Sequence, residues 1–383
     1  MATMDRREVL GLAVAAAVGT ALGRTVSAQG GARGAAPAGA APKVKLDAYS
    51  RTLHWLRTPE DVAQVCHEIG NTTIDLTVRP YPGHVEPAKV KTDLPPFVNA
   101  LKRNGITVSM IGMDVYDAKT PNLEAMLDTA SSLGIHHTWW RGVSFDQSLP
   151  WPKQLDAVKP TVAELSKMLE KYQFKACYHP GGSFPELIDL VRNFDPRYIS
   201  LHYDTGNFGE FNQGNLAKQI RIGGPYIGGF VWKDFVIDHR TPEQIAADAA
   251  ARGAAAPAGA PNAGARGGGG ARGAGAGGRG GAAAGAGAAP AGRGRGGAGG
   301  GSPNGWSSRQ VPVGTGVLNL PLIAQALRDI NFNGPMECQP EWPELGGPNQ
   351  GSDRLTIPRE EVIRMLKRDF DTVTAALKTA DLV

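Results

Sequence analysis

The sequence predicts an α/β protein built as a (β/α)8 barrel, with parallel strands inside and helices outside. About eight short apolar runs are each followed by a stretch with apolar residues three and four positions apart, and this alternation favours a parallel sheet. Ionisable residues follow the later runs, at His202–Asp204, Lys233–Asp234 and Glu337–Glu341. An open doubly wound sheet is the alternative, but no Gly-rich phosphate-binding motif follows any of the runs.

The expected helices end at turn-forming residues, which separates them from the strands that follow. Gly70, Asn104–Gly105 and Gly134 each stop a helix just before the next strand. The clearest expected helices are Pro59–Ile69, Pro121–Leu133, Thr161–Tyr172 and Pro358–Leu377. The expected strands are Thr52–Leu56, Thr73–Val78, Ile106–Val115, Ile135–Val143, Phe174–His179, Tyr198–Asp204, Ile227–Phe235 and Gly334–Glu341.

Residues 1–28 have the pattern of a twin-arginine export signal. Arg6-Arg7 precede a modestly apolar run that extends to Leu22, and small residues before Gln29 offer a cleavage site. The run is too short and too rich in Ala and Gly for a stable membrane anchor, although a Sec signal or an uncleaved anchor are the alternatives. We therefore expect a mature chain that begins at Gln29 and works in a bacterial periplasm or outside the cell.

Two low-complexity segments divide the remaining chain. Residues 29–46 and 249–301 consist mostly of Gly, Ala, Pro and Arg, which bury too little apolar surface to offset the entropy of ordering, so we expect a disordered linker and a disordered insertion after strand seven. Residues 47–248 and 302–383 then form one barrel, close to the roughly 250 residues typical of this fold. RNA binding by the insertion arginines is the alternative to a tolerated insertion, and we expect no nucleic-acid partner.

The net charge, the three cysteines and two of the acids give little information about the function. The net charge of +4 comes largely from the insertion, so it says little about the partner of the barrel. Cys66, Cys177 and Cys338 are expected to be buried free thiols, neither paired nor nucleophilic. Asp234 and Glu337 are expected to be surface or supporting acids.

Polar side chains on the last three strands are expected to meet near the open end of the barrel. Side chains alternate between the two faces of a strand, so His202 shares a face with Asp204, and Gln339 shares a face with Glu341. Lys233 lies in strand seven, between the strand of His202 and Asp204 and the strand of Gln339 and Glu341. If Glu341 points into the barrel, these five side chains converge, and His202 and Gln339 are then expected to bind the substrate.

Strands two, four and five supply further candidates. Arg79 ends strand two and Arg141 ends strand four after Trp140. An arginine near an indole can hold sugar hydroxyls or an anionic group while the ring stacks on the C–H face of a sugar. Tyr178 and His179 end strand five with opposite facings, so only one of them points inward.

Several short motifs follow one another in a fixed order between Thr73 and Leu377. They are Ile74–Arg79, Gly83–Val85, Tyr203–Asp204, Lys233–Phe235, Val313–Gly316, Gly334–Pro335 and Glu341. In this order and spacing they resemble the sugar phosphate isomerase/epimerase family, the xylose-isomerase-like TIM barrels. The resemblance implies enolisation of a ketose or keto-sugar, commonly assisted by a divalent metal at the open end of the barrel.

The resemblance also implies four metal ligands, of which this sequence keeps Asp204 and Glu341. The strand-five position falls on Tyr178 and the strand-seven position falls on Val231, so a site for Mn²⁺, Mg²⁺ or Zn²⁺ stays open but weakened. Lys233, two residues after Val231, is the alternative source of the positive charge.

We therefore expect an enzyme that abstracts a proton next to the carbonyl of a small carbohydrate, as an isomerase, an epimerase or a related lyase. Glu341 is the expected base, with its pKa raised by neighbouring carboxylates. Lys233 or a metal would stabilise the enediolate, and His179 or Tyr178 would donate a proton. The alternatives are a barrel that binds carbohydrate without turnover, and a metal-dependent phosphodiesterase or abasic-site nuclease. No pattern specifies an oligomeric state.

Overall fold

The computed structural model describes residues 43–179, 183–212, 215–239, 241–244, 246, 306–341 and 351–383. The expected export signal, the linker up to residue 42 and the insertion at 249–301 lie outside the described residues. Among the residues that are described, no helix combines the length and the apolar content needed to cross a membrane.

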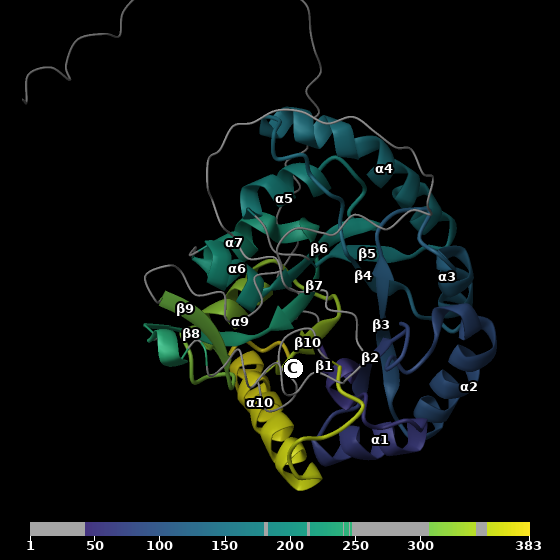
Figure 1. The fold of residues 1–383 in the computed structure, drawn as a ribbon, viewed down its shortest axis with the longest axis vertical. Coiled ribbons are helices and arrows are strands. Elements are labelled where there is room, and N and C mark those ends of the chain that lie inside the picture. The colour runs from purple at the N-terminus through teal and green to yellow at the C-terminus, as the bar shows by residue number, and fades with distance from the viewer. Residues whose placement is uncertain are drawn as a thin grey trace, which may run out of the picture. The chain divides into compact units, whose positions relative to one another are not determined.

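Eight parallel strands close into a barrel, which confirms the predicted fold class (Figure 1). The hydrogen-bonded order is β1-β10-β7-β6-β5-β4-β3-β2, so each strand lies beside its neighbour in the sequence and the last barrel strand, β10, closes on β1. The barrel strands are β1 (Leu46–Tyr49), β2 (Thr73–Thr77), β3 (Thr107–Val115), β4 (His137–Trp140), β5 (Lys175–Tyr178), β6 (Ile199–Asp204), β7 (Ile227–Trp232) and β10 (Met336–Cys338).

Helices surround the barrel and cover the outer faces of its strands (Figure 1). Three of the described helices begin with a side-chain cap, where Thr58, Asn215 or Asn319 accepts a backbone N–H of the first turn. The α-helices are α1 (Pro59–Glu68), α2 (Val90–Arg103), α3 (Leu123–Ser132), α4 (Trp151–Lys171), α5 (Phe184–Val191), α6 (Thr205–Asn212), α7 (Leu216–Gly223), α9 (Leu320–Asp329) and α10 (Arg359–Thr379). Short 3-10 turns are η1 (Ser50–Leu53), η2 (Pro87–Lys89) and η3 (Gly224–Tyr226).

The expected first strand, Thr52–Leu56, is wrong. The strand that pairs with β2 and β10 is β1, and the chain then enters the turn η1. β1 has no apolar run because Asp47 is buried inside the barrel, where its Oδ2 accepts a 2.5 Å hydrogen bond from Ser109 Oγ. The apolar residues that suggested a strand are buried although they lie in or after this turn; Leu53, for example, is 1% exposed.

The expected seventh strand, Ile227–Phe235, is two elements. β7 ends at Trp232, and after Lys233 the chain forms β8 (Asp234–His239), which pairs antiparallel with β9 (Trp306–Val311). This hairpin stands outside the barrel order, and the sequence of the insertion runs between its two strands.

The barrel interior is polar, in contrast to the apolar layer between the barrel and its helices. Leu201, Tyr203 and Phe230 belong to the outer apolar cluster, as expected from the alternation along β6 and β7. A small inner cluster consists of Tyr49, Met110 and Trp139. The inner face also buries polar side chains to 1% exposure or less, namely Asp47, Asp75, His202, Asp204, Glu337 and Gln339. Burying so many polar groups costs stability unless they are paired with one another. Buried polar groups that lack a partner therefore point to a functional site.

Candidate active site

The ammonium group of Lys233 lies between two carboxylates at the carboxyl ends of the strands. Lys233 Nζ is 2.9 Å from Asp204 Oδ2 and 2.9 Å from Glu341 Oε2. The side chains of Lys233, Asp204 and Glu341 are 5%, 0% and 7% exposed, so this ion triad is shielded from water. The convergence expected from the strand pattern is therefore present for these three residues.

Asp204 is held in place by the start of α6 as well as by Lys233. Its Oδ1 accepts the backbone N–H groups of Gly206, at 2.9 Å, and Asn207, at 3.1 Å. A Cβ atom on Gly206 would lie 3.1 Å from Lys233 Cβ, so glycine permits the close approach of these two segments. Burial by itself raises the pKa of Asp204, but Lys233 and His179 together lower it below its ordinary value, so the carboxylate is ionised at neutral pH.

His179 is the inward-facing residue at the end of β5. Its Nε2 donates to Asp204 Oδ2 at 3.2 Å, and its ring centroid lies 4.8 Å from that of Trp139. Burial lowers the pKa of His179 to about 4. A neutral imidazole whose N–H is already bonded to Asp204 is a weak proton donor, so this arrangement favours His179 as a residue that orients Asp204, and its role as the general acid stays a prediction.

Tyr178 and Trp140 lie on the opposite side of the barrel wall, which corrects their expected place at the sugar site. Both belong to the outer apolar cluster, and their rings meet edge to face with centroids 5.2 Å apart. Trp140 Nε1 donates to the carbonyl oxygen of Tyr116 at 2.9 Å. The indole that faces the interior is the preceding residue, Trp139, because neighbouring side chains on a strand point to opposite faces.

Two arginines flank Trp139 on its rim side. The Cζ atom of Arg79 lies 4.5 Å from the Trp139 ring centroid, and that of Arg141 lies 5.5 Å from it. Arg141 Nε and Nη2 are each 2.6 Å from Asp114 Oδ1, and Arg79 Nη2 is 3.4 Å from the same atom. Arg79 and Arg141, expected from the sequence as substrate-binding residues, thus share one acid, Asp114, that the sequence pattern did not single out.

Glu337 is a buried acid near the Lys233 triad, which excludes the surface position and agrees with the alternative of a supporting acid. Trp139 Nε1 donates to Glu337 Oε1 at 2.9 Å, and Gln339 Nε2 donates to Glu337 Oε2 at 2.6 Å. His202 Nε2 lies 3.4 Å from Glu337 Oε1. Burial raises the pKa of Glu337 to about 8, so this group is protonated at neutral pH. The alternation that links Glu337 with Gln339 and Glu341 was the signal that places it inside.

The pKa of Glu341 is shifted in the direction opposite to the one expected. Burial alone raises the pKa of Glu341, but the charge and hydrogen bond of Lys233 outweigh it and lower the pKa below its ordinary value. The same pairing raises the pKa of Lys233 despite its burial. The raised pKa expected for Glu341 is therefore wrong, because its nearest charge is the lysine and not another carboxylate.

Asp234 is a structural acid. Its carboxylate accepts the backbone N–H groups of Gly314 and Gly316, each at 2.9 Å, and of Leu318 at 3.2 Å. A Cβ atom on Gly316 would lie 2.2 Å from Asp234 Oδ1, so this turn requires glycine. Asp234 fixes the loop after β9 and supports the position of Lys233, the residue before it.

The residues at this site do not fit a divalent metal. The two acids that the resemblance assigned to a metal are both bound to the ammonium of Lys233, and a cation would have to displace it. The strand-seven position is Val231, which is buried and offers no donor atom. Within the described ranges, no group of three or more His, Cys, Asp or Glu side chains is arranged to hold a metal ion. A structural zinc site has four protein ligands and a catalytic one has three, whereas the family positions here supply two acids that Lys233 already binds.

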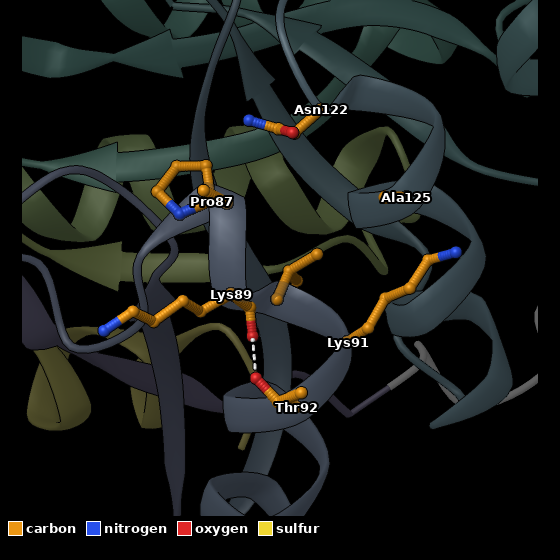
Figure 2. A pocket seen from close by; sticks show the side chains of 8 residues that line it. Pro87, Lys89, Lys91, Thr92, Asn122 and Ala125 are labelled. Carbon is orange, nitrogen blue, oxygen red and sulfur yellow. Dashed lines mark hydrogen bonds between the residues drawn. The ribbon is translucent and has the colours of Figure 1, made fainter.

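A surface hollow elsewhere on the molecule lacks carboxylates and histidines (Figure 2). It lies where η2 meets α2, beside the start of α3, and Thr92 Oγ1 donates to the carbonyl oxygen of Lys89 at 3.0 Å within it. Its lining residues are Pro87, Ala88, Lys89, Val90, Lys91, Thr92, Asn122 and Ala125. None of these lining residues is an acid or a histidine.

The fold and the site define a (β/α)8 barrel with a lysine-bridged pair of acids at its open end. The chain belongs to the xylose isomerase-like TIM barrel family, whose model matches residues 63–367. This confirms the family resemblance drawn from the strand-end motifs. No curated protein sequence matches this chain.

Solved structures with the same fold include sugar epimerases. D-Psicose 3-epimerase from Clostridium cellulolyticum H10, solved with D-tagatose, has 13% identity over 87% of this chain and 99% of its own, with a TM-score of 0.51. L-Ribulose 3-epimerase has 12% identity over 88% of this chain and 95% of its own, with a TM-score of 0.52. The IolI protein, solved with a zinc atom, has 13% identity over 87% of this chain and 99% of its own, with a TM-score of 0.51. At these identities the likeness establishes the fold.

The buried acid Glu337 is expected to make the protein less stable as the pH rises. Its folded pKa, about 8, lies above the ordinary value of 4.5, so the folded state keeps a proton that the unfolded state loses. Stability from this group is complete below pH 4.5, falls by up to about 1.4 kcal/mol per pH unit above it, and is fully lost above about pH 8. Chemical denaturation of the wild type and Glu337→Gln between pH 5 and 9 measures this. A parallel pH dependence in both proteins would contradict the assignment.

Proposed function

We propose that this protein catalyses proton transfer next to the carbonyl group of a small carbohydrate, as an isomerase, an epimerase or a related lyase. The observation that carries the proposal is the ammonium of Lys233, held at 2.9 Å from both Asp204 and Glu341. Enolisation requires a base near the C–H bond and a fixed positive charge near the carbonyl oxygen. Glu341 and Lys233 are the pair that supplies both.

In the proposed reaction, Glu341 is the base. Its lowered pKa keeps it ionised at neutral pH, so it accepts the proton from the carbon next to the carbonyl. The electron pair of that C–H bond forms the enediolate, whose negative oxygen receives a hydrogen bond from Lys233. Return of the proton from Glu341 to the former carbonyl carbon, with transfer of the hydroxyl proton of the neighbouring carbon to the oxygen held by Lys233, gives the isomer, whereas return to the original carbon gives back the substrate with its hydrogen exchanged.

Asp204 and His179 hold Lys233 in position. Asp204 already accepts two backbone N–H groups and the N–H of His179, so its role is to hold the ammonium. A charge that is fixed before the reaction stabilises the transition state without the cost of reorganisation. Lys233 thereby takes the electrostatic role that a divalent metal fills in metal-dependent enzymes of this chemistry.

A carbohydrate substrate is supported by the family and by the sugars named for similar structures, D-tagatose and L-ribulose among them. We further propose that the protein acts in a bacterial periplasm or outside the cell, which rests on the export-signal pattern of residues 1–28. In that location an unphosphorylated sugar is the favoured substrate.

Incubation with keto-sugars in deuterium oxide tests the proposed reaction. We expect the wild type to incorporate solvent deuterium at the carbon next to the carbonyl, as followed by NMR. Binding of a sugar without any incorporation, with or without added Mn²⁺, Mg²⁺ or Zn²⁺, would instead favour a barrel that binds carbohydrate and does not turn it over. That alternative is supported by the replacement of two family ligand positions by Tyr178 and Val231.

A further inference from the structure

Arg79 and Arg141, which we call the arginine pair, carry two positive charges and share one carboxylate partner. Their side chains are 8% and 10% exposed, and both contact the single carboxylate of Asp114. Burial raises the pKa of Asp114, but the two arginines lower it below its ordinary value, so it is ionised. Burial also lowers the pKa of Arg79, to about 10, which leaves it charged at neutral pH. One positive charge in the group is therefore in excess.

Arg79 also has unmet hydrogen-bond donors. Within the described part of the chain, neither its Nε nor its Nη2 has a hydrogen-bond acceptor, although the residue is only 7% exposed. Its ion pair with Asp114, at 3.4 Å, is too long to satisfy the Nη2 donors well. A buried guanidinium with unmet donors is costly unless a ligand supplies the acceptors.

The arginine pair adjoins the proposed catalytic site through Trp139. The indole of Trp139, which carries Arg79 on its face, packs at a tilt against His179 with ring centroids 4.8 Å apart, and His179 in turn bonds to Asp204. Tyr49 lies against the same indole, with ring centroids 5.6 Å apart. Burial raises the pKa of Tyr49, and the charges of Arg79, Glu341 and Lys233 all act on its phenol. Trp139 and His179 thus connect the arginine pair to the Lys233 triad through direct contacts.

We propose that the arginine pair binds a carboxylate of the substrate, so that the substrate class is a keto-sugar acid. This inference rests on the proposed proton-transfer function. A guanidinium presents its N–H groups in a planar fork that matches the two oxygens of a carboxylate. The one excess positive charge also matches a carboxylate better than a phosphate group, which carries about −1.5 to −2 at neutral pH.

Three ligands that share a skeleton and differ only at C6 test the proposal: D-fructose, D-fructuronate and D-fructose 6-phosphate. By isothermal titration calorimetry, we expect the wild type to bind D-fructuronate at least about tenfold more tightly than D-fructose, as expected for charge-assisted hydrogen bonds. Arg79→Gln is expected to remove this preference, so that it binds D-fructuronate no more tightly than D-fructose. Arg79→Lys keeps the charge without the fork and should show an intermediate preference.

Arg221→Gln provides the matched control, because it removes one arginine charge from α7, where Arg221 pairs with Asp329. It should leave the preference for the acid unchanged, and thermal melts of all variants report whether they fold. Equal affinity for D-fructuronate and D-fructose, tighter binding of the phosphate than of the acid, or an unchanged preference in Arg79→Gln would each overturn the proposal. Calorimetry reports binding whether or not turnover occurs, so failure of deuterium exchange rejects the proposed reaction separately.

Discussion

Replacing Glu341 with glutamine is expected to lower deuterium exchange by about 100-fold to 10,000-fold, the range that a general base contributes. The amide is nearly the same size as the carboxylate but has no basic oxygen, so it cannot accept the proton. Lys233 keeps its contact with Asp204 at 2.9 Å, so the variant should remain folded. The measurement is the rate of deuterium incorporation into a keto-sugar that the wild type exchanges, followed beside a thermal melt.

Glu170→Gln is the matched control for this experiment. Glu170 is an exposed acid in the last turn of α4, away from the carboxyl ends of the strands, and its replacement removes the same charge. Its exchange rate should equal that of the wild type. Undiminished exchange in a folded Glu341→Gln protein would reject Glu341 as the base.

Lys233→Met is expected to reduce both stability and exchange. Removing the ammonium leaves Asp204 and Glu341 buried without their counter-charge, and breaking a buried ion pair in this way typically costs about 3 to 5 kcal/mol of stability. Loss of a positioned charge stabiliser raises the reaction barrier by about 2.7 to 4 kcal/mol, which is roughly 100-fold to 1,000-fold in rate. Urea denaturation and deuterium exchange measure the two effects separately.

A double variant separates the structural from the chemical role of Lys233. In Lys233→Met with Asp204→Asn, one negative charge is removed together with the positive one, so much of the lost stability should return. Exchange should stay low, because no positive charge faces the carbonyl oxygen. Recovery of exchange in the double variant would show that Lys233 matters only for folding.

Most of the barrel was predictable because most of its strands and helices have a recognisable local sequence pattern. β2, β3 and β6 differ from their expected bounds by a residue or two, since apolar runs bounded by turn residues define them. β1 was not predictable in this way, because Asp47 places a buried charge in the middle of a four-residue strand. Its pairing with β10 depends on closure of the barrel, which no local pattern encodes.

The site was predictable where period-two alternation along one strand decides the facing. Asp204, Lys233 and Glu341 met as expected because each lies at or just beyond a strand end. The choice between Trp139 and Trp140 requires the register of β4 against its neighbours, so the sequence pattern assigned the wrong indole. The pKa direction expected for Glu341 was wrong for a related reason, since it depends on whether Glu341 or Glu337 contacts Lys233.

The most direct test of the central role of Lys233 is deuterium exchange by the wild type after exhaustive treatment with a chelator. Because the ammonium of Lys233 supplies the positive charge between Asp204 and Glu341, we predict that the chelated protein exchanges at the untreated rate. We also predict that added Mn²⁺, Mg²⁺ or Zn²⁺ does not raise that rate. Exchange that disappears on chelation and returns with one of these ions would contradict the assignment of this role to Lys233.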